Sequence, residues 1–321
     1  MEENRFDIPI VLMFFKRFDY VVSVIDRLRE IKPTKLYLFS DGGRNEEEIA
    51  LINEGRIKVE SAIDWDCEVV KRYQPVNAGV YNQIALGAKW VFEKEEYAIF
   101  LEDDNLPEIT FFSFCKKALD FYKNNDKIIW ICGTNYLEKS VSNKGYHFTK
   151  NMMPCGWASW SHKFLKYYDF NLEHTNKPDF KKIFKSKYKN KKLAEQQYNS
   201  IMREKNHFEK NGKYISWDHH MTLTIRMNDL YGIVPSNNQI KNIGVDNESI
   251  HGGNSFKNIM TRRFCGIESF PIDKEVNFNN DIVIDKKFER KTNHIILYPF
   301  IDRVKGKLAK IYHFIKGDRK W

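Results

Sequence analysis

A short apolar run that ends in three consecutive carboxylates constrains this chain more than any other feature of its sequence. The residues from Tyr97 to Leu101 have the length and composition of a buried strand, and Glu102, Asp103 and Asp104 follow directly. In open α/β sheets, ligands bind outside the carboxyl ends of the strands. Adjacent carboxylates repel one another, so their concentration at such an end predicts a compensating cation. Oxygen ligands suit Mg²⁺ or Mn²⁺, which use one or two carboxylates together with water and substrate phosphates. A solvated acidic turn is the alternative interpretation.

Short apolar runs alternate with segments of helical periodicity around this motif. The runs predict strands, and the periodic segments predict helices, over these ranges: strands at 8–15, 35–39, 67–73, 97–101 and 127–132, and helices at 20–31, 46–63, 84–92 and 110–122. The alternation predicts an α/β fold with a mostly parallel sheet and helices on both faces. The sequence lacks a Gly-x-Gly-x-x-Gly fingerprint and a Walker loop, which argues against dinucleotide binding and P-loop chemistry.

Composition sets the class of protein and its expected location. The hydrophobic content of 42% is typical of a globular chain, and no apolar stretch is long enough to span a membrane. Five widely spaced cysteines without a Cys-x-x-Cys pair indicate reduced thiols. The amino terminus is acidic and lacks the features of a signal peptide, so we expect a cytoplasmic protein.

The net charge of +9 is concentrated in two places. Residues 181–192 hold seven lysines, and residues 299–321 are also basic. Such clusters are typical of contacts with nucleic acid, anionic membranes or phosphorylated substrates, or simply of solvated helix faces. No zinc-finger spacing, ribonucleoprotein aromatic motif or Gly-x-x-Gly clamp accompanies the charge, so nucleic acid is not an expected partner.

The carboxyl terminus predicts a basic amphipathic helix over residues 299–316. Its apolar residues recur at spacings of three and four from Phe300 to Ile315, with basic residues beside them. This composition is typical of a segment that lies in a membrane interface, which would place the protein at the inner face of the plasma membrane. Packing on its own domain or on a second subunit is the alternative.

Four segments, in order over residues 8–256, resemble nucleotide-sugar glycosyltransferases of the GT-A type. The similarity is to bacterial surface-polysaccharide transferases and to the N-acetylglucosaminyltransferase I family. The acidic motif, followed by Pro107 and paired phenylalanines, is similar to the Glu-Asp-Asp motif of that family, and residues 155–160 resemble a Gly-Trp-Ala-Thr-Trp segment. Trp217–Asp218 resembles a catalytic Trp-Asp pair, and residues 242–251 resemble a late loop that closes over the diphosphate.

The resemblance implies roles for individual residues on the donor side. Arg17 would lie near the nucleotide, and Asp41 would read uracil, which makes a UDP-sugar the expected donor. Asp104 would bind Mn²⁺ or Mg²⁺ directly, while Glu102 and Asp103 would hold the ribose or the metal's water ligands.

Four further residues complete the predicted site. Asn77 and Gly79 would line the donor pocket, because glycine lets the backbone approach a ligand. Ser249 would contact the diphosphate, and His251 is a second candidate metal ligand, although a histidine in a polar loop is as often only a loop residue.

Asp218 is the candidate base that removes the proton from the acceptor hydroxyl in an inverting transfer. It precedes a helical pattern, so a helix cap is the alternative. The adjacent His219 and His220 are not expected to share a metal, because neighbouring residues on a helix do not face one site. Trp157 and Trp160 could form a platform for a sugar ring, or pack in the core.

Taken together, the sequence predicts a metal-dependent, inverting glycosyltransferase that acts in bacterial surface-polysaccharide synthesis. A nucleotide sugar is the expected donor, and a saccharide or lipid-linked saccharide is the expected acceptor. A sugar-phosphate nucleotidyltransferase and a non-enzymatic, basic nucleic-acid-binding protein are the alternatives. We expect a GT-A catalytic domain at residues 1–270 and a carboxyl-terminal appendage at 271–321. Within the catalytic domain, the predicted nucleotide half is 1–105. The predicted acceptor half is 106–270, and it contains a Lys-rich helical insertion at 171–213.

Overall fold

The computed structural model describes residues 5–244 and 264–300. Ser249, His251 and nearly all of the predicted helix at 299–316 therefore lie outside the described residues. None of the helices in the described part of the chain is both long and apolar enough to cross a bilayer.

Within these residues, eight strands form one mixed sheet in the order β3-β2-β1-β4-β8-β6-β9-β7. The strands of this sheet are β1 Ile10–Phe14, β2 Lys35–Ser40, β3 Glu68–Tyr73, β4 Tyr97–Glu102, β6 Ile128–Cys132, β7 Tyr146–Thr149, β8 Trp157–Trp160 and β9 Tyr231–Pro235. The first four sequential strands pair in parallel, as the sequence predicts. Strand β8 then enters antiparallel between β4 and β6, so the second half of the sheet is mixed rather than parallel.

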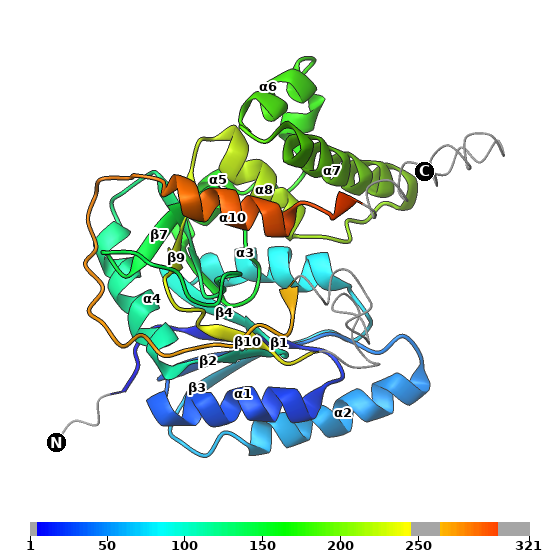
Figure 1. Ribbon diagram of the computed structural model, residues 1–321. Coiled ribbons are helices and arrows are strands. Elements are labelled where there is room, and N and C mark those ends of the chain that lie inside the picture. Colours follow the sequence, from blue (N-terminus) through cyan, green and yellow to red (C-terminus); the bar gives the residue numbers. More distant parts are fainter. Residues whose placement is uncertain (1–4, 245–263, 301–321) are drawn as a thin grey trace.

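Helices cover both faces of the sheet (Figure 1). The helices of the α/β part are α1 Phe18–Ile31, α2 Glu46–Ser61, α3 Gly87–Phe92, α4 Ile109–Tyr122 and α5 Ser161–Tyr167, with a π-helical turn at Asn82–Leu86. Residues Ile10, Leu12 and Phe14 pack with α1, α2 and α4, whereas Val11 and Met13 pack into the core on the opposite face. This alternation is the period of two expected for a strand that is buried on both faces. The α/β fold class is confirmed.

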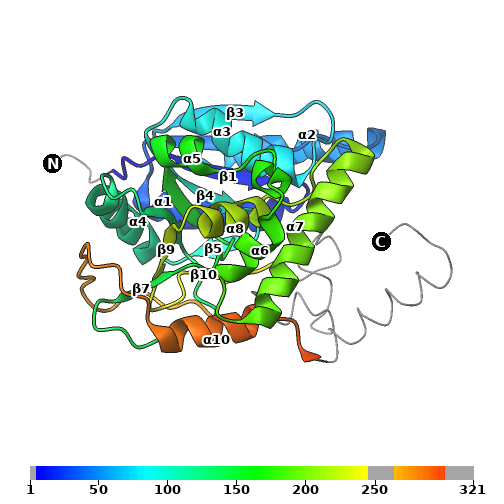
Figure 2. The ribbon, with the colours of Figure 1, turned by 90° about the horizontal axis from the view of Figure 1, so that it is seen from above.

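The later helices lie together beyond one face of the sheet, on the side opposite α1 and α2 (Figures 1 and 2). They are α6 Phe180–Ser186, α7 Lys191–Asn211, α8 Asp218–Met227 and α10 Lys286–Ile296. Helix α7 begins at Asn190, whose side chain accepts hydrogen bonds from the amides of Lys192 and Leu193, and it ends at Gly212, which has a positive φ of 68°. Within the segment 171–213, α6, α7 and a short 3₁₀ turn at Glu173–Asn176 are helical.

Both tryptophans considered as a sugar platform belong to the core. Trp157 is 1% exposed and stacks on Phe100, with ring centroids 3.9 Å apart. Trp160 is fully buried, and its indole nitrogen donates to the carbonyl of Leu119 at 2.9 Å. The platform interpretation is wrong, because neither ring presents a face to a ligand.

The described part of the predicted appendage packs into the same body. The ring of Phe288, on α10, stacks on that of His147 with centroids 4.0 Å apart. The side chain of Asn151 donates to the hydroxyl of Thr292 at 3.1 Å. Helix α10 thus packs against the same body, and the boundary at 270 stays a prediction.

His147 provides a test of this packing through pH. Burial lowers its pKa to about 4, and the nearby Asp285 only partly opposes this effect. The native state therefore favours neutral His147, and the corresponding stability is present above pH 6.5, the ordinary value, and is lost as the pH falls toward 4. We expect His147→Phe to reduce the loss of unfolding free energy over this range, as measured by denaturant titration at several pH values. His294→Phe, at an exposed position on α10, should leave the pH dependence unchanged; equal slopes in the two variants would contradict the prediction.

Candidate functional site

The acidic motif lies where the sequence predicts it, at the carboxyl end of β4. Alternation along the strand places Glu102 on the same face as Ala98 and Phe100, toward the later helices. After Asp104 the chain forms the short strand β5, Asn105–Pro107, which pairs antiparallel with β10, Ile240–Asn242. The acidic motif and the late segment at 240–244 are therefore held side by side.

Arg17, which follows β1, lies against this motif. Its Nη2 forms ion pairs with Asp103 and, at 3.1 Å, with Asp104, and its Nη1 donates to the carbonyl of Gly244 at 3.4 Å. Burial acts to lower the pKa of Arg17, but the two carboxylates outweigh it and raise that pKa above its ordinary value. Part of the compensating positive charge predicted for the motif is thus supplied by the chain itself.

One guanidinium does not neutralise three carboxylates. Burial, followed by repulsion from Asp104 and Asp103, raises the pKa of Glu102 well above its ordinary value. Burial and Asp104 likewise raise the pKa of Asp103 to about 7, although Arg17 opposes this shift. Ionisation of all three carboxyl groups is therefore costly, and a further cation would reduce that cost.

The donor set around Asp104 fits a divalent cation that is shared with a substrate. Its Oδ2 bonds to Arg17, and its Oδ1 accepts from the Asn105 amide at 2.6 Å. No group of three or more His, Cys, Asp or Glu side chains is arranged around a metal position in residues 5–244 and 264–300. Mg²⁺ and Mn²⁺ commonly bind through one or two carboxylates and phosphate oxygens, so the set suits a metal that a diphosphate completes.

Asp41 organises the segment predicted to line the donor pocket. Its two oxygens accept five hydrogen bonds from this neighbourhood, with distances between 2.7 and 3.1 Å, namely from the backbone amides of Gly42, Ala78 and Gly79 and the side chains of Asn77 and Gln83. A carboxylate offers about four lone pairs, so these donors occupy its accepting capacity. The reading of uracil by Asp41 stays a prediction; in this structure its carboxylate holds the 77–83 segment in place.

Gly79 adopts a positive φ of 83°, a conformation that disfavours residues with a side chain. A Cβ atom there would meet no atom within 4 Å, so the requirement for glycine is conformational rather than spatial.

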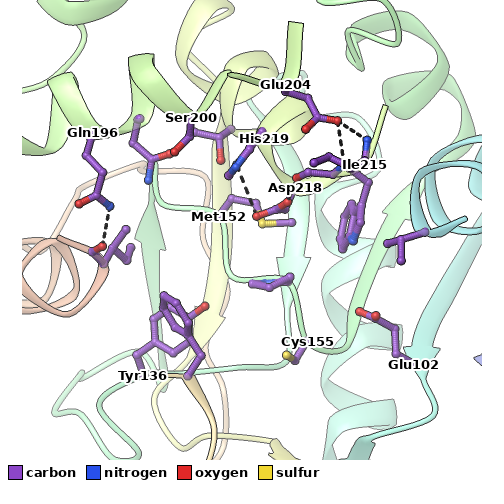
Figure 3. A pocket seen from close by; sticks show the side chains of 18 of the residues that line it. Glu102, Tyr136, Met152, Cys155, Gln196, Ser200, Glu204, Ile215, Asp218 and His219 are labelled. Atoms are coloured by element: carbon purple, nitrogen blue, oxygen red, sulfur yellow. Dashed lines mark hydrogen bonds and ion pairs between the residues drawn. The ribbon is translucent and has the colours of Figure 1, made fainter. Parts of the chain in front are cut away.

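Asp218 and the acidic motif line one cavity of about 380 Å³ (Figure 3). Glu102 and Asp104 line its sheet side, and Asp218 lies at the start of α8. Trp217, at the N-cap position, leaves α8 without a side-chain cap, so the geometry does not support the helix-cap alternative for Asp218. The remaining lining comes from several later segments: Val80, Tyr136, Met152, Pro154, Cys155, Gln196, Gln197, Ser200, Arg203, Glu204, Ile215, Ser216, Trp217, His219, Thr222, Asn242, Phe264, Cys265, Ile296 and Tyr298.

Short contacts orient Asp218 in the cavity. One oxygen accepts a hydrogen bond from the Ser216 hydroxyl, and the other lies 3.6 Å from Nδ1 of His219. Glu204, from α7, accepts the backbone amides of Ile215 and Ser216 at 2.5 and 2.8 Å. The α7 carboxylate thus positions the turn that carries Asp218.

The paired histidines diverge, as the sequence predicts. His219 lines the cavity, whereas His220 is fully buried and its Nδ1 donates to the carbonyl of Asp169 at 2.7 Å. Burial lowers the pKa of His220 to about 4, so it is neutral at physiological pH.

Sequence reasoning missed the contribution of α7 to this cavity. Its lining residues are Gln196, Gln197, Ser200, Arg203 and Glu204. Residues separated by three, four or seven positions lie on the same face of a helix, and all five of these lining residues are polar. The polar stripe can be read from the sequence, but the segment that contains it was interpreted only as a Lys-rich insertion.

Gly244 provides a test of the packing around the acidic motif. A Cβ atom at this position would lie 2.2 Å from Nη1 of Arg17 and 2.4 Å from Oδ2 of Asp104. We expect Gly244→Ala to lower the free energy of unfolding by about 1–3 kcal/mol, because overpacking forces the buried ion pair apart. Gly232→Ala is the control, since its Cβ would make ordinary contacts of 3.4 Å with Trp130. Denaturant melts measure both, and an equal effect of the two substitutions would refute the assignment.

Comparison with known proteins identifies no family for this chain. No protein-family model matches the sequence, and no curated protein matches it. Several solved structures match the chain at low similarity. A UDP-glucose pyrophosphorylase complexed with UDP-glucose is 11% identical, with a TM-score of 0.36 over 73% of this chain and 92% of that one. The mannosyltransferase PcManGT from Pyrobaculum calidifontis, in complex with GDP-Man and Mn²⁺, is 9% identical, with a TM-score of 0.36 over 69% of this chain and 70% of that one. A putative glucose-1-phosphate thymidylyltransferase from Bacillus anthracis, in complex with a sucrose, is 8% identical, with a TM-score of 0.30 over 54% of this chain and 76% of that one. Each is an enzyme that handles sugars or nucleotide sugars by its description, and nothing about the activity of this chain follows from similarities of this size.

Proposed function

We propose that this protein is a metal-dependent, inverting glycosyltransferase that moves a sugar from a nucleoside diphosphate sugar to an acceptor hydroxyl. The observation that carries the proposal is the shared cavity, which has a strand-end acidic pair, Glu102 and Asp104, on one side and Asp218 on the other. An inverting transfer needs this division, because the departing diphosphate and the attacking hydroxyl occupy opposite faces of the sugar.

The donor side of the proposal rests on the ends of β1, β2 and β4. These strands pair in parallel, so Arg17, Asp41 and Asp104 follow strand ends at one edge of the sheet. Arg17 and the 77–83 segment that Asp41 holds in place would receive the nucleotide, and a UDP-sugar is the donor that we propose.

Mn²⁺ or Mg²⁺, held by Asp104 with the diphosphate, would neutralise the charge that grows on the leaving group. Asp104 accepts one hydrogen bond on each oxygen, from Arg17 and from Asn105, so each oxygen retains a lone pair with which it could hold the cation. Arg17, which lies next to Asp104, would place a guanidinium near the incoming diphosphate, a group that guanidinium binds through paired hydrogen bonds.

Asp218 would accept the proton of the attacking hydroxyl. Ser216 donates to one of its oxygens and Glu204 holds the turn beneath it, so the carboxylate has a defined direction in the cavity. The residue lies at the amino end of α8.

A nucleotidyltransferase would use a similar acidic metal site but would not need a carboxylate placed for the acceptor hydroxyl. The two reactions release different products, free nucleoside diphosphate in one case and a nucleotide sugar with pyrophosphate in the other. Incubation with UDP-sugars and Mn²⁺, followed by chromatography of the products, separates them.

The metal role of Asp104 is testable with one substitution. Asp104→Asn should abolish the Mn²⁺-dependent part of UDP affinity, measured by calorimetry with and without the metal, because an amide is a weak ligand for a hard cation. Asp120→Asn, at an exposed position on α4, is the control. Mn²⁺-dependent binding retained in Asp104→Asn would exclude the assignment.

The role of Asp218 is testable by separating chemistry from donor binding. Asp218→Asn should lower kcat by ~10²-fold or more, the usual scale for loss of a general base. The affinity for UDP should change little, because the residue faces the acceptor side. Asp273→Asn, at an exposed position, should be indistinguishable from the parent protein. Near-normal turnover with a lower melting temperature in Asp218→Asn would instead indicate a structural role.

A further inference from the structure

The wall of the cavity formed by α7 has unused hydrogen-bonding capacity. Two members of its polar stripe bond to the protein backbone: Gln196 contacts the carbonyl of Ile296 at 2.9 Å and the amide of Tyr298 at 2.7 Å, and Glu204 holds the turn before α8. The other three, Gln197, Ser200 and Arg203, have no hydrogen-bonding or ionic partner among the described residues.

These three side chains are spaced by three residues and so form one ridge along the helix. Ser200 is 8% exposed, yet its hydroxyl lines the cavity and bonds to no described group (Figure 3). Thr222, from α8, is 9% exposed and is in the same situation. Both hydroxyls therefore face the cavity with their hydrogen-bonding capacity free, so each can bond to a polar ligand there.

Arg203 adds charge to this ridge. It is the only arginine or lysine among the described residues that line the cavity, and it is exposed. Carboxylates surround the same space, from Glu102 and Asp104 on the sheet side to Glu204 and Asp218 on the helix side. Unlike Arg17, which is bound to two of the acidic residues, Arg203 pairs with none that the structure describes.

We propose that Gln197, Ser200, Arg203 and Thr222 form the acceptor subsite, and that the acceptor is an anionic saccharide whose acidic group binds Arg203. This inference rests on the proposed function for the identity of the cavity. Hydroxyl and amide side chains suit the hydroxyl groups of a sugar, and a guanidinium binds an oxyanion through two parallel hydrogen bonds. Arg203 is the one cationic residue in the described lining that could offset repulsion between such a group and the acidic residues of the cavity.

The experiment compares three probes that share one sugar ring: methyl β-glucoside, methyl β-glucuronide and methyl β-glucoside 6-phosphate. Their binding to the full-length protein is measured by ligand-detected NMR, alone and in the presence of UDP and Mn²⁺. We expect an anionic probe to bind about tenfold more tightly than the neutral one, a difference of ~1.4 kcal/mol. Comparison of the glucuronide with the phosphate identifies which acidic group is preferred.

Variants assign the preference to the ridge. Arg203→Gln should remove the advantage of the anionic probes, and Ser200→Ala should weaken all three probes alike. Arg290→Gln, an exposed position on α10 outside the cavity, is the matched control. UDP binding should persist in every variant, because none of these residues lies on the donor side.

Equal affinities for the neutral and anionic probes, or an anionic preference that survives Arg203→Gln, would overturn the inference, as would the absence of binding by all three probes. If the parent protein shows no Mn²⁺-dependent binding of UDP, the proposed function is refuted instead. The two failures are distinguishable, because the saccharide measurements are also made without nucleotide.

Discussion

Repulsion among three carboxylates at the end of one buried strand is the constraint around which the site is arranged. Asp103 and Asp104 bind Arg17 from the neighbouring strand end, and Arg17 in turn binds the carbonyl of Gly244. The β5–β10 pair fixes the late segment beside the motif, and Gly244 has no space for a side chain. Residues more than 200 positions apart in the sequence are therefore held together by charge compensation as much as by apolar packing.

The cavity combines two structural sources with different properties. The sheet contributes strand ends whose positions are fixed by backbone pairing, and these carry the acidic residues. The later helices contribute the opposite wall, where the polar face of α7 and the start of α8 provide hydroxyl, amide and carboxylate groups. Under the proposed function, the donor would bind at the sheet side of the cavity, and side chains of α7 would contact the acceptor.

The sequence predicted local features well and the relations between distant segments less well. Apolar runs identified strands such as β1 and β4, because burial on both faces leaves a continuous hydrophobic signal. The antiparallel insertion of β8 was not predicted, since nothing within residues 157–160 specifies which strand edge they join. Trp157 was considered as a ligand platform because the sequence around an aromatic residue does not show whether its ring packs in the core or faces a ligand.

Site prediction followed the same division. Asp104 and Asp218 were identified from motifs, and the structure places both in one cavity, while their chemical roles stay predictions. The bonds of Asp41 to the 77–79 backbone depend on how a loop folds over a strand end, which sequence spacing does not encode. The residues of α7 were overlooked because a polar helical face is typical of solvent exposure, and only the packing of α8 and residues 296–298 reveals that it borders a cavity.

The position of β8 has a consequence for how the chain is made. Strands β3, β2, β1 and β4 come from residues 10–102 and can pair among themselves, but the free edge of β4 is completed only by residues 157–160. At about 5–20 residues per second, a ribosome needs several seconds to supply the intervening segment. During that interval the nascent sheet has an open apolar edge, the kind of surface that recruits strands from other chains. The order of synthesis therefore leaves the β4 edge unpaired until β8 has been made.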